Sequence, residues 1–181
     1  MEHKPEYIEF PIGNEVKFND MKNVYELIAQ AKNSGEPKPE EYWLKVFPEY
    51  SLRHFYFLDN DVKPELVTAK RDNNNWHFSA MIDLLQTDLE VELMECKRIG
   101  NKGRIEFSAY SYPYGGITGL TIFLNSFDCK ASEIDEGGGV YSVHWNSDCD
   151  FKLNEIVTSV NSNLPKMERT WWQKLFGVNK L

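Results

Sequence analysis

The N-terminal third of the chain carries apolar residues at helical spacing. Between Asp20 and Ser34, apolar positions recur every three or four residues, which predicts an amphipathic helix that ends at Gly35. A second helix is expected to open at Pro39 and to stop at Pro48. Before both helices, residues 7–12 form a short apolar stretch with a proline inside it, which is typical of an edge strand or an extended lead-in.

Alternation of apolar and polar residues predicts two antiparallel hairpins further along the chain. The first covers about 90–112, with strands at about 90–99 and 104–112 around a Gly-Asn-Lys-Gly turn. The second covers 131–145 around the three glycines at 137–139. Because such strands have one apolar face each, we expect both hairpins to share a single antiparallel sheet.

The remaining apolar segments favour helices. Residues 117–127 have the composition of a short buried helix, residues 151–161 show helical spacing, and an amphipathic segment closes the chain. The order of elements is therefore helices, hairpin, helix, hairpin, helices. That order is typical of an α+β fold. We predict a single α+β domain over residues 1–181, with one antiparallel sheet packed against N-terminal, central and C-terminal helices.

The charge balance bears on the kind of partner. The chain has 28 Asp and Glu residues against 20 Lys and Arg, a formal net charge of −8. Nucleic acids are bound by clustered cations that neutralise phosphates, so this excess of acids disfavours a nucleic-acid binder. The same charge attracts a basic protein and speeds its association. We therefore expect a protein partner of basic character, with a homodimer as an alternative.

Targeting signals and cysteine usage bear on location. Residues 1–10 carry charges and a proline where a secretory signal needs a run of about ten apolar residues. No stretch supplies the roughly 20 apolar residues that cross a bilayer. Cys96, Cys129 and Cys149 form no Cys-x-x-Cys pair, which favours reduced thiols over disulfides or a zinc site. We expect a cytoplasmic protein.

Motifs for catalysis and cofactor binding are absent from the sequence. The glycines at 137–139 lead into a strand, and no Lys-Ser or Lys-Thr follows them, so they do not form a phosphate loop. The histidines lack metal-ligand spacing. The residue types for a catalytic cysteine–histidine pair are present, since His144 could act with Cys129 or Cys149, but no family signature surrounds either cysteine. We expect no metal and no cofactor, and we favour a non-enzymatic role.

Acidic residues are concentrated between positions 128 and 155, a segment that contains seven Asp and Glu residues but only two lysines. Such a region is either a solvated face or a docking surface for a basic partner. The candidate partner-binding residues are Glu133, Asp135, Glu136, Asp148 and Asp150.

Two other segments offer alternative sites. Tyr112, Tyr114, Gly115 and Gly116 lie between a predicted strand and a predicted helix, where they could line the mouth of a ligand or substrate pocket. The C-terminal segment combines cations with the apolar residues Trp171, Trp172 and Phe176. We favour docking of this segment on the domain, and a membrane surface or a homodimer contact are the alternatives.

In general character the chain resembles the immunity proteins that neutralise bacterial toxins. It is small, acidic, α+β in pattern, rich in Trp and Tyr, and without a catalytic motif. The resemblance implies a non-catalytic inhibitor that covers the active surface of a basic toxin or enzyme. The alternatives are a small enzyme or ligand-binding domain, and a peripheral membrane or scaffold protein that acts through its C-terminus.

Overall fold

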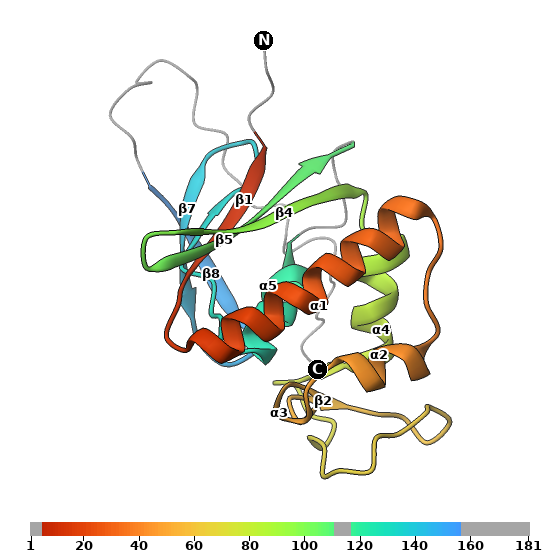
Figure 1. Ribbon diagram of the computed structural model, residues 1–181. Helices are drawn as coiled ribbons and strands as arrows, with labels where there is room; N and C mark the ends of the chain where they lie inside the picture. The colour runs from red at the N-terminus through yellow and green to blue at the C-terminus, as the bar shows by residue number, and fades with distance from the viewer. Residues whose placement is uncertain (1–4, 111–116, 157–181) are drawn as a thin grey trace, which may run out of the picture.

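A computed structural model describes residues 5–110 and 117–156 of the chain. It confirms the predicted α+β fold (Figure 1). The strands are β1 (Glu6–Pro11), β2 (Phe55–Tyr56), β3 (Trp76–His77), β4 (Val91–Ile99), β5 (Lys102–Ala109), β6 (Glu133–Asp135), β7 (Val140–Trp145) and β8 (Phe151–Glu155). The helices are α1 (Glu15–Ser34), α2 (Glu40–Val46), α3 (Glu49–Leu52), α4 (Phe78–Asp83), the π-helical turn η1 (Leu84–Asp88) and α5 (Thr118–Ser126).

The main sheet has six antiparallel strands in the order β4-β5-β1-β6-β7-β8. Both predicted hairpins are present, and β1 joins them by pairing with β5 on one side and β6 on the other. The prediction that this segment is an edge strand is therefore wrong. Pro11 does not prevent the central position because it is the last residue of β1, where the ladder ends.

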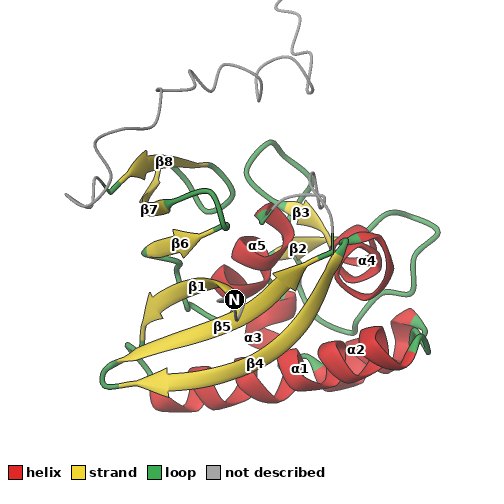
Figure 2. Cartoon of the chain, turned by 90° about the horizontal axis from the view of Figure 1, so that it is seen from above, coloured by secondary structure: helices red, strands yellow, loops and turns green. Residues whose placement is uncertain are grey.

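Helix α1 packs along one face of the sheet and begins five residues earlier than predicted (Figure 2). The side chain of Asn14 caps it by accepting hydrogen bonds from the backbone N–H groups of Val16 and Lys17, at 2.9 and 3.1 Å. Gly35 ends the helix in the left-handed conformation, with φ 68°, as the sequence predicts. Its apolar side fills the space beneath β4, β5 and β1, as expected for an amphipathic helix.

Residues 151–155 form the edge strand β8, so the helix predicted over 151–161 is wrong for this part. The chain turns back after β7 because the backbone N–H groups of Asn146 and Ser147 donate to the carbonyl of Asp150. Phe151 and Leu153 then point to the same face of the sheet as their β7 partners Trp145 and Val143, as residues two apart in a strand do. Residues 157–161, and the expected C-terminal helical segment, lie outside the described residues.

An aromatic cluster fixes α5 between the sheet and the smaller helices. Phe123 and Phe127 on α5 contact Phe47 after α2, at centroid separations of 6.1 and 5.6 Å. Phe47 in turn meets Phe78 of α4 edge to face at 5.2 Å. Tilted and edge-to-face pairs of this kind are the favoured geometries for buried rings. Helix α5 is therefore held in place, with Asn125 and Ser126 at its C-terminal end.

The opposite face of the sheet carries charged side chains, and no helix of the described part covers it (Figure 2). Its carboxylates are nonetheless nearly enclosed by neighbouring cations. Glu9 accepts hydrogen bonds from Lys102 Nζ at 2.8 Å and from Arg104 Nε at 3.0 Å, and Glu106 pairs with Lys97 at 2.6 Å. We call these five residues the outer-face charge network. None of the helices within residues 5–110 and 117–156 is long and apolar enough to cross a membrane.

Candidate functional site

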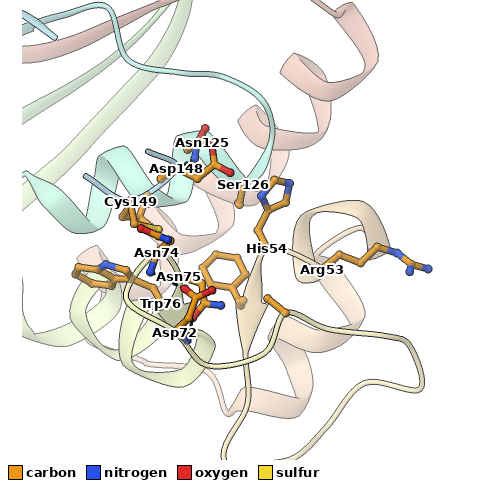
Figure 3. Close-up of a pocket in the computed structure, with 13 residues that line it drawn as sticks. Arg53, His54, Asp72, Asn74, Asn75, Trp76, Asn125, Ser126, Asp148 and Cys149 are labelled. Carbon is orange, nitrogen blue, oxygen red and sulfur yellow. Dashed lines mark hydrogen bonds between the residues drawn. The ribbon is translucent and has the colours of Figure 1, made fainter. Parts of the chain in front are cut away.

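A cavity of about 270 Å³ opens where four separate segments of the chain meet (Figure 3). These are the end of α3 leading into β2, the turn before β3, the C-terminal half of α5, and the turn between β7 and β8. Its lining combines polar side chains with apolar and aromatic ones. They include Asp72, Asn74, Trp76, Asn125, Asp148 and Cys149.

The turn before β3 is held by its own side chains. The Asp72 carboxylate accepts a hydrogen bond from the backbone N–H of Asn74, and the side-chain Oδ1 of Asn75 accepts one from the backbone N–H of Asp72. The Asn75 amide also donates to the carbonyl of Lys70. Short Asp and Asn side chains favour turns because they can bond to nearby backbone in this way. The turn therefore presents Asp72 and Asn74 in fixed positions before the strand begins at Trp76.

The carboxylates of Asp72 and Asp148 both influence the thiol of Cys149, which lines the same cavity. Burial first, and then the negative charges of Asp148 and Asp72, together raise the pKa of the Cys149 thiol to about 11. Both acids line the cavity together with Cys149, although 76 positions separate them in the sequence. Asn125 joins α5 to the turn between β7 and β8, because its Nδ2 donates to the carbonyl of Asp148 at 2.7 Å.

The chain's own cations neutralise the cavity only in part. Arg53 pairs with Glu49 at 3.4 Å, and its side chain extends away from the other labelled groups in Figure 3. Lys130 donates to Oδ1 of Asp148 at 3.0 Å, in a pair whose two side chains are about half exposed. Within the described part of the chain, no cation pairs with Asp72. Cations of the described residues therefore balance the two carboxylates of the lining only in part.

Next to the cavity runs a long connection, the β2–β3 loop of residues 57–75. Loops longer than about 12–15 residues without secondary structure are uncommon and are usually functional or disordered. This one is ordered and carries three exposed aliphatic side chains: Leu58, Val62 and Val67 are 41%, 40% and 79% exposed. Its C-terminal end forms one wall of the cavity.

Specific contacts hold the β2–β3 loop in place. His77 Nε2 and Asp61 Oδ2 lie 2.6 Å apart, and Asp61 also accepts the backbone N–H of Leu58. Burial raises the pKa of Asp61, but the bonds from His77 and Leu58 outweigh it and leave that pKa below its ordinary value. The His77 ring stacks on Tyr56 at 5.4 Å. The first half of the loop is thereby joined to β3, and the second half is joined to β2 because the Ala69 N–H donates to the carbonyl of Phe55 at 3.1 Å.

The predicted acidic residues fall into two groups. Glu133, Asp135 and Glu136 lie at one end of β7, because Asp135 pairs with Val140. Asp148 and Asp150 follow the other end of the strand, and a six-residue strand at about 3.3 Å per residue separates the groups by roughly 16 Å. Only Asp148 lines the cavity. The five residues therefore lie at opposite ends of the three-stranded unit β6-β7-β8 and do not form one patch.

Several of these acids are bonded by the chain itself. Tyr7 donates to Glu133 at 2.8 Å, and Asn146 Nδ2 donates to Asp150 at 2.9 Å. The alternative pocket residues Tyr112, Tyr114, Gly115 and Gly116 lie outside the described residues, as do Trp171, Trp172 and Phe176. Those two alternatives stay predictions.

A cysteine–histidine catalytic pair finds no support in the side chains. His144 is exposed on β7, whereas burial and the charge of Asp128 raise the pKa of Cys129 to about 12. Cys129 and Cys149 are therefore protonated at neutral pH, and a protonated thiol is a poor nucleophile. Among the residues for which coordinates are described, no group of three or more His, Cys, Asp or Glu is placed to hold a metal ion.

The cavity was not predicted from the sequence, although part of its signal is visible there. The polar run from Asp72 to Asn75 predicts a loop, and the tryptophan directly after it could have marked that loop as a contact site. The second carboxylate, Asp148, joins it only through folding. Comparison with known proteins adds no assignment, because no protein-family model, curated protein or solved structure matches the chain.

Proposed function

We propose that this chain is a non-catalytic protein-binding protein whose contact surface is the β2–β3 loop together with the cavity at its base. The observation that carries the proposal is the exposure of Leu58, Val62 and Val67 on a loop held by His77 and Asp61. Several exposed aliphatic side chains on one loop beside a cleft favour an interaction site, because covering this apolar surface with a partner lowers the free energy of the system.

A protein partner fits this surface better than a cofactor does. Sites for drug-sized ligands and cofactors usually enclose roughly 300–1,000 Å³ in a mostly apolar lining. Here the cavity is about 270 Å³, and its lining mixes the carboxylates and amides with the apolar side chains of Phe55, Trp76 and Ile122. Its one thiol, Cys149, is protonated at neutral pH, which disfavours nucleophilic catalysis. A cavity of this size suits one side chain of a partner that also covers the exposed aliphatics.

The charge of the site favours a basic partner. The Asp72 carboxylate, which pairs with no cation of the described residues, and the net charge of −8 both attract a cationic protein and repel an acidic one. Inhibition of a basic toxin or enzyme is the form of this function that agrees with the general resemblance to immunity proteins.

Affinity capture from a lysate of the native cells, with paired loop and control variants, tests the proposal. The loop variant is Val62→Ser with Val67→Ser, and its control is Val16→Ser, another exposed valine, on α1. We expect the wild type and the control to retain one stoichiometric basic protein at low and moderate salt. The loop variant should retain at least tenfold less, since each lost apolar contact costs affinity. Equal capture by both variants would contradict the proposed surface.

A further inference from the structure

We infer that the cavity receives an arginine side chain of the partner, in preference to a lysine. The inference deepens the proposed function and rests on it for the identity of the chain that supplies the arginine. The cavity's own preference for a guanidinium group can be tested without that partner.

The size of the cavity fits one long side chain. A cavity of about 150 Å³ holds a benzene ring, and a water molecule takes about 30 Å³. At about 270 Å³ the cavity therefore has room for a planar group of similar size with its aliphatic stem. It is small for a second ring system, which excludes a dinucleotide or a similar cofactor.

Carboxylate oxygens are available inside the lining. Oδ1 of Asp72 accepts the Asn74 N–H, and Oδ1 of Asp148 accepts Lys130 Nζ. For the second oxygen of each carboxylate, no donor is found within the described part of the chain. Both acids line the same cavity as Cys149, so one cationic group in that cavity can interact with both carboxylates.

The arrangement suits a guanidinium group more than an ammonium group. A guanidinium is a rigid planar fork with five N–H donors, so it can bond two carboxylates at once, whereas an ammonium is a compact charge that holds its water tightly. The Trp76 indole in the lining offers a flat face, and arginine stacks on aromatic rings more often than lysine does. Asn125 donates through Nδ2 to Asp148, which leaves its Oδ1 to accept a further N–H.

A titration followed by ¹H–¹⁵N NMR tests the inference on the full chain. The probes are N-acetyl-arginine methylamide and N-acetyl-lysine methylamide at neutral pH, and Trp76→Phe identifies the Trp76 indole signal among the five tryptophans. With the arginine probe, we expect saturable shifts of this indole and of the backbone amides of Asp72, Asn74 and Cys149. A single side chain makes few contacts, so the dissociation constant should be about 1–10 mM. The lysine probe should bind at least fivefold more weakly.

Matched variants locate the site. Asp72→Asn keeps the oxygen that caps the turn but removes the charge, and it should weaken arginine binding at least fivefold, as should Asp148→Asn. Glu92→Gln removes one exposed charge from the far edge strand β4 and should leave the titration unchanged. Equal binding of the two probes, or shifts spread over the surface without saturation, would overturn the inference.

The two proposals fail in different ways. If capture of the partner depends on Val62 and Val67 while neither probe perturbs Trp76, the protein-binding surface stands and the arginine site is wrong. If the arginine probe binds in the cavity and the loop variant still captures the partner fully, the proposed contact surface is wrong.

Discussion

The outer-face charge network and the cavity both contain carboxylates, but they differ in what surrounds them. In the network, Glu9 is held by Lys102 and Arg104, and its side chain is only 7% exposed. In the cavity, Asp72 has no cation from the described part of the chain, and Asp148 shares a half-exposed one, Lys130. The carboxylate of Glu9 thus finds its cations within the same chain, whereas the carboxylates of the cavity keep oxygen atoms that can accept hydrogen bonds from a partner molecule.

This difference shows why counting acids does not locate a binding site. A carboxylate whose cations come from the same chain contributes to folding and has little left to offer a partner. A carboxylate fixed by backbone N–H groups alone keeps its charge for an incoming cation. The acids that matter for association are therefore those that the fold leaves uncompensated.

The largest effect is expected from breaking the network. Glu9→Gln removes the charge that pairs with Lys102 and Arg104, and we expect it to lower the free energy of unfolding by roughly 2 kcal/mol, since bonds to charged groups are among the stronger ones. Asp72→Asn should change it by less than about 0.5 kcal/mol. Urea denaturation at pH 7 measures both. A larger loss for Asp72→Asn would reverse the comparison.

The pH dependence of stability sharpens the same contrast. Burial raises the pKa of Glu9, but the hydrogen bonds from Lys102 and Arg104 outweigh it, so the pKa lies below its ordinary value of 4.5. A carboxyl whose pKa is lower in the folded state stabilises the protein above its unfolded pKa and loses that contribution as the pH falls through the folded value. Below about pH 4.5, the wild type should therefore lose more stability than Glu9→Gln. Parallel urea midpoints from pH 7 to pH 3 would contradict this.

A smaller and local effect is expected at the loop. His77→Phe keeps a ring to stack on Tyr56 but removes the hydrogen bond to Asp61, at a cost of about 1 kcal/mol. Because that bond joins the β2–β3 loop to β3, proteolytic cleavage within residues 57–75 should become faster while the sheet stays protected. His144→Phe, at an exposed position on β7, is the control and should leave the cleavage rate unchanged.

The smallest effect concerns Cys149. Asp72 and Asp148 both raise the pKa of its thiol, so Asp72→Asn should lower that pKa and speed alkylation at pH 9 by about twofold. Cys129 responds to Asp128 and Lys17, and its rate should not change. Peptide-level mass spectrometry after a timed reaction distinguishes the two. An unchanged rate at Cys149 would mean that Asp72 does not face the cavity as described.

The sequence was informative where structure is decided locally. Each hairpin combines alternating residues with a glycine turn between its strands, and both were predicted. The central position of β1 could not be predicted, because Ile8 pairs with Ile105 and Ile134, about a hundred residues away. Strand β8 was mistaken for a helix because its few apolar residues fit either period.

The candidate site shows the same limit more sharply. Asp148 was predicted to bind a partner because of acidic neighbours in sequence, but its neighbours in space are Asn125, Cys149 and the turn of Asp72. No local pattern links positions 72 and 148. The exposure of Val62 and Val67 also depends on how the β2–β3 loop lies on the domain, which the sequence does not specify.

Hydrogen–deuterium exchange on the complex with the captured basic partner tests the central claim most directly. If the loop and the cavity form the contact surface, backbone amides in residues 57–76 and 146–150 should exchange more slowly in the complex than in the free protein. Residues 6–11 and 102–109, which carry most of the outer-face charge network, should be unchanged. Slower exchange over those strands, with the loop and the β7–β8 turn unaffected, would contradict the account.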